Sequence, residues 1–446
     1  MMSKSFVRAA PALAALVLLA ACGRADQRRA PATTSANAPA ASAGSAQGKA
    51  APATQTTAAR PTQPGAVVGH APQFIRGIYL NTYAAGSHQR LHQLLDLADR
   101  SEINTFVVDV KDERGPHYNS QVPLVQQLTQ PGQNTLKDLK TLTDTLHAHH
   151  IYAVARIVVF KDPILSKAKP DWSIRKAGGG LWTDKKGNTW VSAWDRDVWN
   201  YNIEIAQEAA KAGFDEIQFD YVRFPEPFPS LPPQVHPEAK GNRTDAIVGF
   251  LNEAKQRLHP LGVPVAADVF GLSPADGDDI NIGQQWERIV TTADHVLPMV
   301  YPSHFLASHL PNDPRPNRAP GETVYKALGL GDIRVDRLKQ AGVAHVARVI
   351  PWLQAFSAPW VDHNFTYGPE QAREQAQAAY QTGHEDWVFW HPGAKYELIE
   401  AAFAPKPAQR HAQKFQPTAE LVSYEKVLEG RGAAAARAQV AKTAGR

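Results

Sequence analysis

The sequence after residue 72 alternates eight times between strand-like and helix-like segments, and this alternation constrains the fold more than any other feature. Short β-branched or aromatic runs that end in polar residues predict the strands. Apolar residues spaced three and four positions apart predict the helices. Helical crossovers return the chain to the same strand direction, and eight parallel strands close a barrel. We therefore expect an α/β fold, a (β/α)8 TIM barrel over residues 73–404.

The predicted strands are Ile75–Thr82, Thr105–Val110, Tyr152–Phe160, Glu216–Val222, Val263–Phe270, His295–Tyr301, Ala344–Ile350 and Asp386–His391. The predicted helices are His88–Arg100, Thr135–His149, Asp197–Ala212, Thr244–Leu258, Ile282–Ala293, Asp332–Ala341, Pro369–Thr382 and Ala394–Phe403. A doubly wound open sheet is the structural alternative. It is disfavoured because Asn81–Gly86, after the first strand, lacks the glycine-rich phosphate-binding fingerprint.

The N-terminal segment has the features of a targeting sequence. Basic residues precede an apolar run, Ala9–Ala21, which is too short for a permanent membrane span and has the layout of a secretory signal. The run leads into Leu19-Ala-Ala-Cys22, which resembles the bacterial lipobox. We expect residues 1–21 to be a lipoprotein signal peptide and Cys22 to carry the lipid. By the same resemblance, Gly23 favours an exported lipoprotein of the outer membrane.

Both ends of the chain differ in composition from its middle. Residues 22–72 are rich in Ala, Pro, Ser and Thr, so we expect a disordered tether, and the basic, Ala-rich tail 405–446 is expected to be frayed or weakly helical. The net charge is +4, but seven basic and one acidic residue give +6 in residues 1–72. Eight basic and three acidic residues give +5 in the tail, which leaves −7 on residues 73–404. A mildly acidic fold without a basic stripe argues against nucleic-acid binding.

One connection, Lys161–Asp195 after the third strand, is much longer than its neighbours. It contains four tryptophans, namely Trp172, Trp182, Trp190 and Trp194. Indole rings at a barrel mouth commonly stack on the apolar faces of sugars, so Trp190 and Trp194 are candidate substrate contacts. The alternative is that the rings form a small core that holds the loop to the barrel rim. The expected barrel thus has an enlarged loop after its third strand.

Carboxylates stand at the outgoing ends of three predicted strands, where TIM-barrel enzymes place catalytic groups. Asp109 lies on the second strand, Asp220 on the fourth and Asp268 on the fifth. Neighbouring strands are about 4.8 Å apart. Asp220 and Asp268 can therefore approach the separation of about 5–5.5 Å found in retaining glycosidases, whereas a wider setting admits a water and gives inversion. The sequence leaves both outcomes open.

Three basic residues, Lys111, Arg156 and Arg223, lie near these acids in the sequence or on adjacent strands. A nucleophilic carboxylate must stay ionised, and a nearby Arg lowers its pKa, whereas an acid catalyst needs the opposite environment. Arg156 and Arg223 are candidates for the first role. Ordinary salt bridges between these cations and the acids are the structural alternative.

Other reaction chemistries lack their motifs. The first strand has no His-x-His pair for a metal-dependent amidohydrolase, and His147, His149 and His150 gather at a helix end, where the dipole favours cations. No Gly-x-Ser-x-Gly nucleophile elbow occurs. Cys22 is the only cysteine, which excludes a catalytic thiol in the fold and an intramolecular disulfide. We expect neither a metal nor another cofactor.

Five segments resemble, in order, a bacterial glycosyl hydrolase domain family that was long catalogued as a domain of unknown function. They are Arg76–Leu80, Phe106–Asp112, Phe214–Pro225, Ala267–Gly271 and Met299–His304. The resemblance covers roughly residues 73–404. The family is similar to α-amylase-like and α-galactosidase-like barrels, in which an Asp ending the fourth strand is the nucleophile and the third-strand loop is enlarged. It therefore implies a glycoside hydrolase with Asp220 as nucleophile.

The sequence departs from the amylase pattern at three points. Gln218 stands where those enzymes have an Arg, Asp268 where they have a Glu, and the seventh-strand segment Ala344–Trp352 has no carboxylate. These departures leave the acid catalyst and the substrate class open.

The first functional hypothesis is a membrane-anchored glycoside hydrolase for an envelope or extracellular glycan, in which Asp220 attacks the anomeric carbon and Asp268 protonates the leaving oxygen. Its expected substrate contacts are Asp109, Lys111, Arg156, Arg223, Tyr301, His304, Trp352, Trp390 and His391, with Trp190 and Trp194 from the long loop. The second hypothesis is a non-catalytic glycan-binding lipoprotein, favoured by the missing seventh-strand acid. A structural envelope tether is a third class. The expected partners are a glycan and a membrane.

Overall fold

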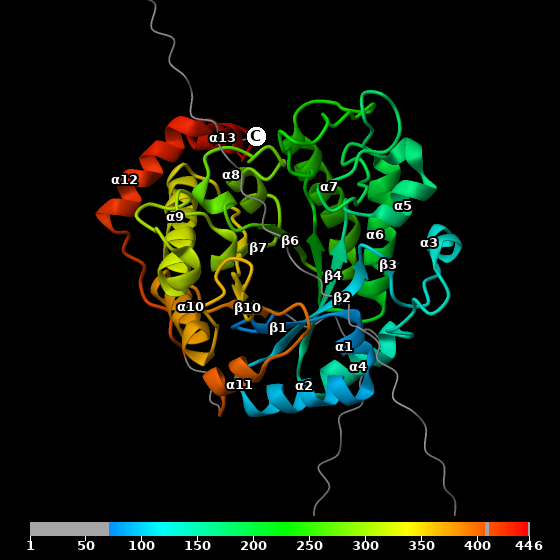
Figure 1. Ribbon diagram of the computed structural model, residues 1–446, viewed down its shortest axis with the longest axis horizontal. Coiled ribbons are helices and arrows are strands. Elements are labelled where there is room, and N and C mark those ends of the chain that lie inside the picture. Colours follow the sequence, from blue (N-terminus) through cyan, green and yellow to red (C-terminus); the bar gives the residue numbers. More distant parts are fainter. Residues whose placement is uncertain (1–70, 406–409, 445–446) are drawn as a thin grey trace, which may run out of the picture. The chain divides into compact units, whose positions relative to one another are not determined.

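The computed structural model describes residues 71–405 and 410–444, and its strands close into a parallel barrel (Figure 1). The strand β1 (Arg76–Leu80) pairs with both β2 (Thr105–Asp112) and β10 (Trp387–Trp390), which completes the ring. The remaining ring positions are β4 (Tyr152–Val158), β5 (Glu216–Asp220), β6 (Val265–Phe270), β7 (His295–Met299), and β8 (Arg348–Val349) with β9 (Trp352–Gln354). The predicted (β/α)8 barrel is confirmed.

Helices surround the barrel (Figure 1). The longer ones are α2 (His88–Arg100), α4 (Leu139–Ala148), α6 (Arg196–Lys211), α7 (Arg243–Leu258), α9 (Pro320–Gln340) and α10 (Pro369–Gln381). The shorter elements are α1 (Thr82–Gly86), β3 (Gly115–Pro116), α3 (Pro123–Leu128), α5 (Pro163–Ala168), α8 (Trp286–Val290) and α11 (Glu397–Phe403). Side-chain caps begin several helices; the Asp195 carboxylate, for example, accepts backbone N–H bonds at the start of α6.

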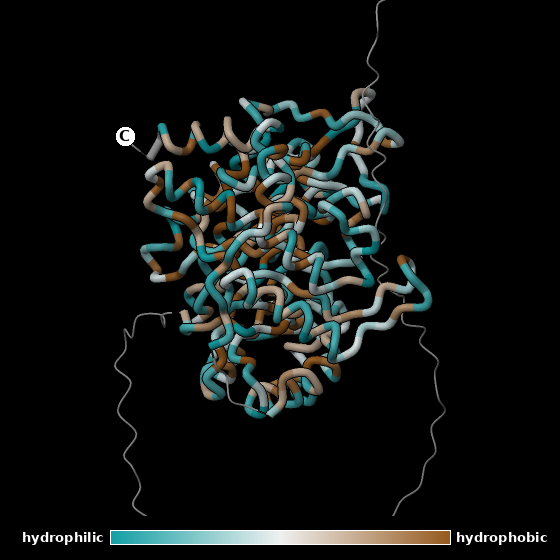
Figure 2. The backbone as a smooth tube through the Cα atoms, turned by 90° about the vertical axis from the view of Figure 1, so that its left-hand side faces the viewer, coloured by the Kyte–Doolittle hydropathy of each residue, from teal (hydrophilic) through white to brown (hydrophobic). Residues whose placement is uncertain are grey.

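The strands are buried on both faces, so two apolar layers form. Side chains such as Phe106, Val108 and Ile217 pack outward against the helices, and the alternate positions Tyr79 and Val107 point into the barrel. Figure 2 shows hydrophobic segments running through the interior of the described part of the chain. Period-two alternation therefore decides which side chains fill the barrel and which hold the helices.

The seventh strand differs from its prediction. Ala344–Ile350 is expected to form it, but pairing begins at Arg348, is interrupted at Pro351, and resumes in β9 up to Gln354. Proline has no backbone N–H to donate to a neighbouring strand, which accounts for the break. The strand end that reaches the barrel mouth is consequently Gln354.

The helix α9 is about twice as long as the predicted segment Asp332–Ala341 and contains glycines that weaken the helical pattern in the sequence. These glycines allow close packing. A Cβ on Gly329 would lie 2.8 Å from the Leu421 side chain, and one on Gly331 would lie 3.0 Å from Pro274 and Trp286. The glycines in α9 thus make room for neighbouring elements.

The C-terminal tail, expected to be frayed or weakly helical, is helical over most of its described residues and packs against α9. It forms α12 (Ala419–Leu428) and α13 (Ala434–Ala444), and Leu421 and Leu428 are fully buried. Both Glu425 carboxylate oxygens accept bonds from Arg337 of α9 at 2.7 Å. Sequence composition hides this packing because a few apolar residues and the ion pairs of Arg337 with Glu425 and Glu429 carry it.

The predicted signal peptide, most of the predicted tether and Cys22 lie outside the described residues. Within the described ranges, no helix combines the length and apolar character needed to cross a bilayer.

We predict that Leu421→Ala lowers the free energy of unfolding of the full-length chain by about 2–5 kcal/mol, because it leaves a cavity where α12 meets α9. Urea denaturation followed by tryptophan fluorescence measures the change. Val427→Ala is the matched control in the same helix, since that side chain is 47% exposed, and it should shift stability by about 0.5 kcal/mol or less. Equal effects of the two substitutions would contradict the packing of the tail.

Candidate active site

Four ionisable residues on neighbouring strands meet inside the carboxyl end of the barrel. Asp109 of β2 is in register with Arg156 of β4, and Arg156 is in register with Gln218 of β5. Asp220 and Asp268 lie on the same interior face, at the end of β5 and within β6. Side chains two residues apart share a face, so the barrel brings together the three acids that the sequence singles out.

The Arg156 guanidinium joins the acids. Its Nη1 donates to Asp109, and its Nη2 and Nε donate to Asp220 Oδ2, the latter over 3.1 Å. Its Nε also lies 3.8 Å from Asp268 Oδ2. Because two carboxylates bind different nitrogens of one planar group, the guanidinium fixes their spacing. Arg156 therefore contacts the nucleophile candidate, as both sequence interpretations, a support for an ionised nucleophile and an ordinary salt bridge, predict.

Asp220 occupies the end of β5 in an unusual backbone setting. Its Oδ1 accepts a bond from the backbone N–H of Tyr221, and its Oδ2 accepts the Arg156 bonds. Tyr221 has a φ of 49°, a positive value that residues other than glycine rarely adopt, bulky ones least of all. Such backbone positions cluster at functional sites, where the surrounding structure holds them in place. The turn thus places the Asp220 carboxylate at the barrel mouth with both of its oxygens hydrogen-bonded.

Asp109 is buried, with 3% of its surface exposed, and accepts bonds from Arg156 and from the Tyr79 hydroxyl. The pKa of Asp109 is raised to about 6, because burial, with a smaller contribution from the nearby Asp112 charge, outweighs the lowering effects of Arg156 and of the Tyr79 hydrogen bond. A carboxyl with such a pKa exchanges its proton near neutral pH. That property suits general acid–base catalysis.

Asp268 is completely enclosed, with 0% of its surface exposed. Gln218 Nε2 donates to its two oxygens at 2.8 and 2.9 Å, and Trp352 Nε1 donates to Oδ1 at 2.7 Å. Burial raises the pKa of Asp268, the Asp220 charge raises it further, and Arg156 with the two donors opposes the shift. This enclosure corrects the expectation that Asp268 is directly available to a leaving group.

Aromatic rings from β7, β9, β10 and their loops form a wall beside the charged cluster. Tyr301 and Trp390 stack with centroids 5.4 Å apart and planes 25° apart. Phe356 contacts Trp390 edge-on at 5.2 Å and stacks on Trp360 at 6.1 Å. Trp360 is 37% exposed, so the wall extends from the barrel interior to the surface. Rings of this kind bind the apolar faces of sugars.

His304 and Trp352 also belong to this region. The His304 ring lies 5.4 Å from Tyr301 and 6.4 Å from Phe356. Burial and, to a smaller extent, the charge of Lys186 lower the pKa of His304 to about 4. Lys186 belongs to the long loop after β4, so this loop approaches the β7 side of the mouth.

Several expected contacts lie elsewhere. The Lys111 ammonium faces Asp162 at 2.9 Å and the Tyr201 ring of α6, because a bulge in β2 between Asp109 and Lys111 turns it toward the helix layer. His391 lies on the loop after β10, near Tyr396. The structure therefore does not group Lys111 and His391 with the carboxylates.

The tryptophans of the long loop pack mainly as a small core. Trp182 and Trp190 are 0% and 1% exposed, and Trp190 donates to Asp184 at 3.1 Å. Trp194 is partly buried against Phe224 at 4.5 Å. The expectation that Trp190 stacks on a sugar is wrong for this conformation, and the alternative of a loop core is confirmed for Trp182 and Trp190.

Sequence reasoning missed four residues of this region: Tyr79, Gln218, Phe356 and Trp360. Tyr79 shares the interior face of β1, and Gln218 shares that of β5 with Asp220, so period-two alternation is a usable signal for both. Phe356 and Trp360 lie beyond the predicted seventh strand and carry no such signal.

Among the residues that the structure describes, no group of three or more His, Cys, Asp or Glu side chains is placed to hold a metal ion.

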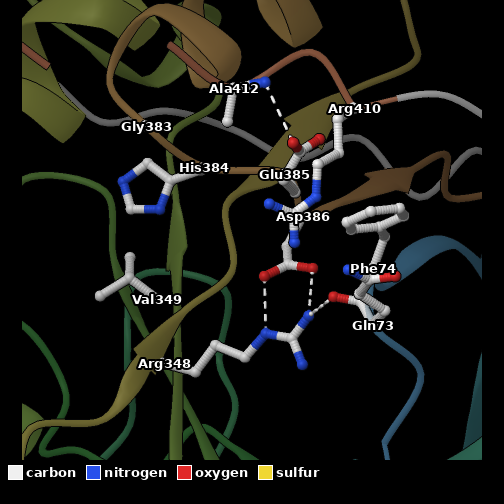
Figure 3. Close-up of a pocket in the computed structure, with 10 residues that line it drawn as sticks. All are labelled: Gln73, Phe74, Arg348, Val349, Gly383, His384, Glu385, Asp386, Arg410 and Ala412. Carbon is white, nitrogen blue, oxygen red and sulfur yellow. Dashed lines mark hydrogen bonds and ion pairs between the residues drawn. The ribbon is translucent and has the colours of Figure 1, made fainter. Parts of the chain in front are cut away.

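A separate depression of about 430 Å³ lies at the opposite, amino-terminal end of the barrel (Figure 3). There Arg348 donates to both oxygens of Asp386 at 2.7 and 2.6 Å and to the Gln73 carbonyl at 2.9 Å. Glu385 accepts a bond from the backbone N–H of Ala412. The charges at this end pair with one another, and TIM-barrel enzymes place their active sites at the carboxyl end of the strands, so we place the active site at the other end.

Comparisons with known proteins agree with this geometry. The sequence profile of the family described as "Putative glycosyl hydrolase domain" matches residues 77–396. The chain belongs to this family. The matched region contains every strand of the barrel except the first residue of β1, together with the whole carboxylate cluster and aromatic wall. The family resemblance predicted from the sequence is confirmed, and the protein is glycoside hydrolase-like.

Solved structures are similar to this family member over different shares of the chain. A hypothetical protein from Ruminiclostridium thermocellum is 37% identical over 43% of this chain and 97% of that chain, with a TM-score of 0.39. The PgaB (BpsB) glycoside hydrolase domain from Bordetella bronchiseptica is 16% identical over 75% of this chain and 100% of its own, with a TM-score of 0.52, which shows a shared fold. Among curated proteins, no sequence matches the chain.

Proposed function

We propose that the protein hydrolyses a glycosidic bond in a glycan of the cell envelope or its exterior, while anchored to a membrane through Cys22. The observation that carries this proposal is the Arg156 guanidinium shared by Asp109 and Asp220 at the barrel mouth. A pair of carboxyl groups held at a fixed separation is the basis of most glycoside hydrolysis.

The proposal gives the two carboxyl groups different roles. Asp220, whose bonds all come from donors that complement an ionised carboxylate, acts at the anomeric carbon. Asp109, with its raised pKa, donates a proton to the leaving oxygen and afterwards accepts one from water. We assign this role to Asp109 and not to Asp268, because an acid catalyst must touch the substrate: Asp268 has 0% of its surface exposed, whereas Asp109 keeps 3%.

The aromatic wall supports a glycan as the substrate. Tyr301, Trp390 and Phe356 lie on one side of the mouth, and Trp390, the partly exposed ring of the three, can stack on a pyranose ring whose glycosidic oxygen reaches Asp109 and Asp220. Sugar stacking on aromatic rings orients a substrate that has many similar hydroxyl groups. In this proposal Asp268 holds Gln218 and Trp352 in place beneath the reacting groups.

A glycan-binding protein without catalysis is the second candidate. Two observations favour it: Asp268 is sealed, and the seventh strand ends in Gln354, whose oxygen is occupied by bonds from Ser303. Such a protein keeps the aromatic wall and loses turnover.

We predict that Asp220→Asn lowers kcat on a cleaved glycan by a factor of about 10⁴–10⁶ while the fold is kept, because the amide cannot act as a nucleophile or base. Product release from a panel of α- and β-linked glycans and peptidoglycan is the assay, and circular dichroism checks the fold. Asp144→Asn, an exposed acid on α4, is the matched control and should keep full activity. Turnover in Asp220→Asn equal to the control would remove the assignment. Proton NMR of the fresh product distinguishes direct attack from activation of a water.

Activity should fall as the pH rises through about 6, because Asp109 must carry a proton to act as the acid and ionises above its raised pKa. Tyr79→Phe removes a hydrogen bond that lowers this pKa, so the alkaline limb of the profile should move to higher pH. Profiles of kcat/KM from pH 4 to 9 measure both effects. An alkaline limb that Tyr79→Phe leaves in place would speak against Asp109 as the proton donor.

For the anchor, we predict that Cys22→Ser releases the protein from the membrane fraction and abolishes incorporation of a labelled fatty acid, because the lipid is attached through the thiol. Fractionation of cells and fatty-acid labelling test this directly, with Ser35→Ala in the same segment as the control. Persistence of both signals in Cys22→Ser would show that another element binds the membrane.

A further inference from the structure

We propose that the barrel mouth contains a subsite for a carboxylate carried by the sugar, formed by Lys161 and Arg223. This inference rests on the proposed function and deepens it by naming the substrate class: glycans built with carboxylated sugars. The carboxylate belongs either to a hexuronic acid or to a lactyl ether on an amino sugar.

The two cations lie against the residue that follows Asp220. The Lys161 ammonium is 4.6 Å from the centroid of the Tyr221 ring, and the Arg223 guanidinium carbon is 5.0 Å from the same centroid. Lys161 enters from the loop after β4, and Arg223 enters from the loop after β5. Two cations from different loops therefore contact the side chain of Tyr221, the residue next to the proposed nucleophile.

Both cations are more than nine-tenths buried, with 9% and 7% of the Lys161 and Arg223 side chains exposed. Within the described residues, no acceptor lies at hydrogen-bond distance from the Lys161 ammonium, whose nearest anion is Glu113 at 3.6 Å. Arg223 Nη1 donates to the Phe224 carbonyl at 3.0 Å and to Glu226 at 3.3 Å. Buried charges are normally fully paired, so these donors have capacity for a further anion.

Aromatic rings pack against the Arg223 guanidinium group and orient it. The guanidinium carbon lies 4.4 Å from the Phe270 ring centroid and 5.2 Å from that of Trp190. Contacts with ring faces orient the guanidinium without using its N–H donors, which match the two oxygens of a planar carboxylate. The buried Trp190, which is unavailable to a sugar face, therefore has a role in this subsite.

The acids around the subsite do not block it. Asp184 is occupied by N–H donors from its own turn and from Trp190. Glu113 and Glu226 are partly exposed, with 42% and 40% of their side chains accessible. Ion pairs of such exposed side chains are weak, so a substrate carboxylate can take their place.

The test compares one library of hexuronic-acid oligosaccharides with the same library after reduction of each carboxyl to a primary alcohol. Binding to the full-length Asp220→Asn chain is measured by affinity mass spectrometry at low ionic strength. We expect the acidic library to bind roughly tenfold more tightly, as charge-assisted hydrogen bonds imply. A second arm uses the disaccharide of N-acetylglucosamine and N-acetylmuramic acid, with and without its lactyl carboxyl reduced, and so distinguishes the two sources.

Substitutions test whether Lys161 and Arg223 cause the tighter binding of carboxylated probes. Lys161→Met and Arg223→Met should each remove most of it, and Lys185→Gln, an exposed cation of the same loop, should leave it intact. Glu113→Gln and Glu226→Gln should strengthen binding of acidic probes several-fold without changing that of neutral ones, because each removes a competing carboxylate. This gain cannot arise from misfolding.

Equal binding of acidic and reduced probes in both arms would overturn the proposal. The outcome is separable from that of the proposed function. A carboxylate preference without cleavage by the wild type supports the subsite and ends the hydrolase assignment. Cleavage of acidic and reduced glycans with equal kcat/KM ends the subsite and keeps the hydrolase.

Discussion

The site depends on one buried cation. Arg156 lies among Asp109, Asp220 and Asp268, and the guanidinium is the positive charge that binds the first two directly. Three carboxylates this close would repel one another in a medium of low dielectric constant. Losing one partner of a buried pair typically costs about 3–5 kcal/mol, because the remaining charge is left uncompensated. The strand ends of β2, β4 and β5 are therefore coupled through a single side chain.

The mouth is divided into two chemically distinct halves. Charged groups come from β2, β4, β5 and β6, whereas the aromatic wall comes from β7, β9 and β10. Trp352 connects the halves, since its ring lies edge-on to that of Tyr79, with the ring centroids 6.4 Å apart, and its Nε1 donates to Asp268. A sugar ring that stacks on the aromatic wall would direct its hydroxyl and glycosidic oxygens toward the charged half. This division explains how one barrel can combine orientation by stacking with electrostatic control of the reacting atoms.

Much of this could be predicted from local sequence patterns. The strand carrying Asp220 and the alternation that turns Asp109 and Asp220 inward follow from period-two spacing, which depends only on nearby residues. The enclosure of Asp268 does not follow, because Gln218 and Trp352 are 50 and 84 residues away in the chain. The full length of α9 could not be predicted because its glycines weaken the helical pattern. The reason for these glycines, close packing against Leu421 and Trp286, appears only in the folded structure. Local signals thus predict the scaffold, and long-range packing decides which acid is accessible.

The depression in Figure 3 also has a bearing on how the protein meets its surroundings. Arg348 holds the Gln73 carbonyl at the amino-terminal end of the strands, while Glu385 holds the chain near Ala412 there. The chain therefore enters the barrel at the end opposite the carboxylates. If the chain is attached through its N-terminal region, the connecting segment joins the barrel at the end opposite the carboxylates. Under the proposed function, a long glycan then reaches the carboxylates without passing that junction, so that bonds within the glycan are as accessible as those at its end.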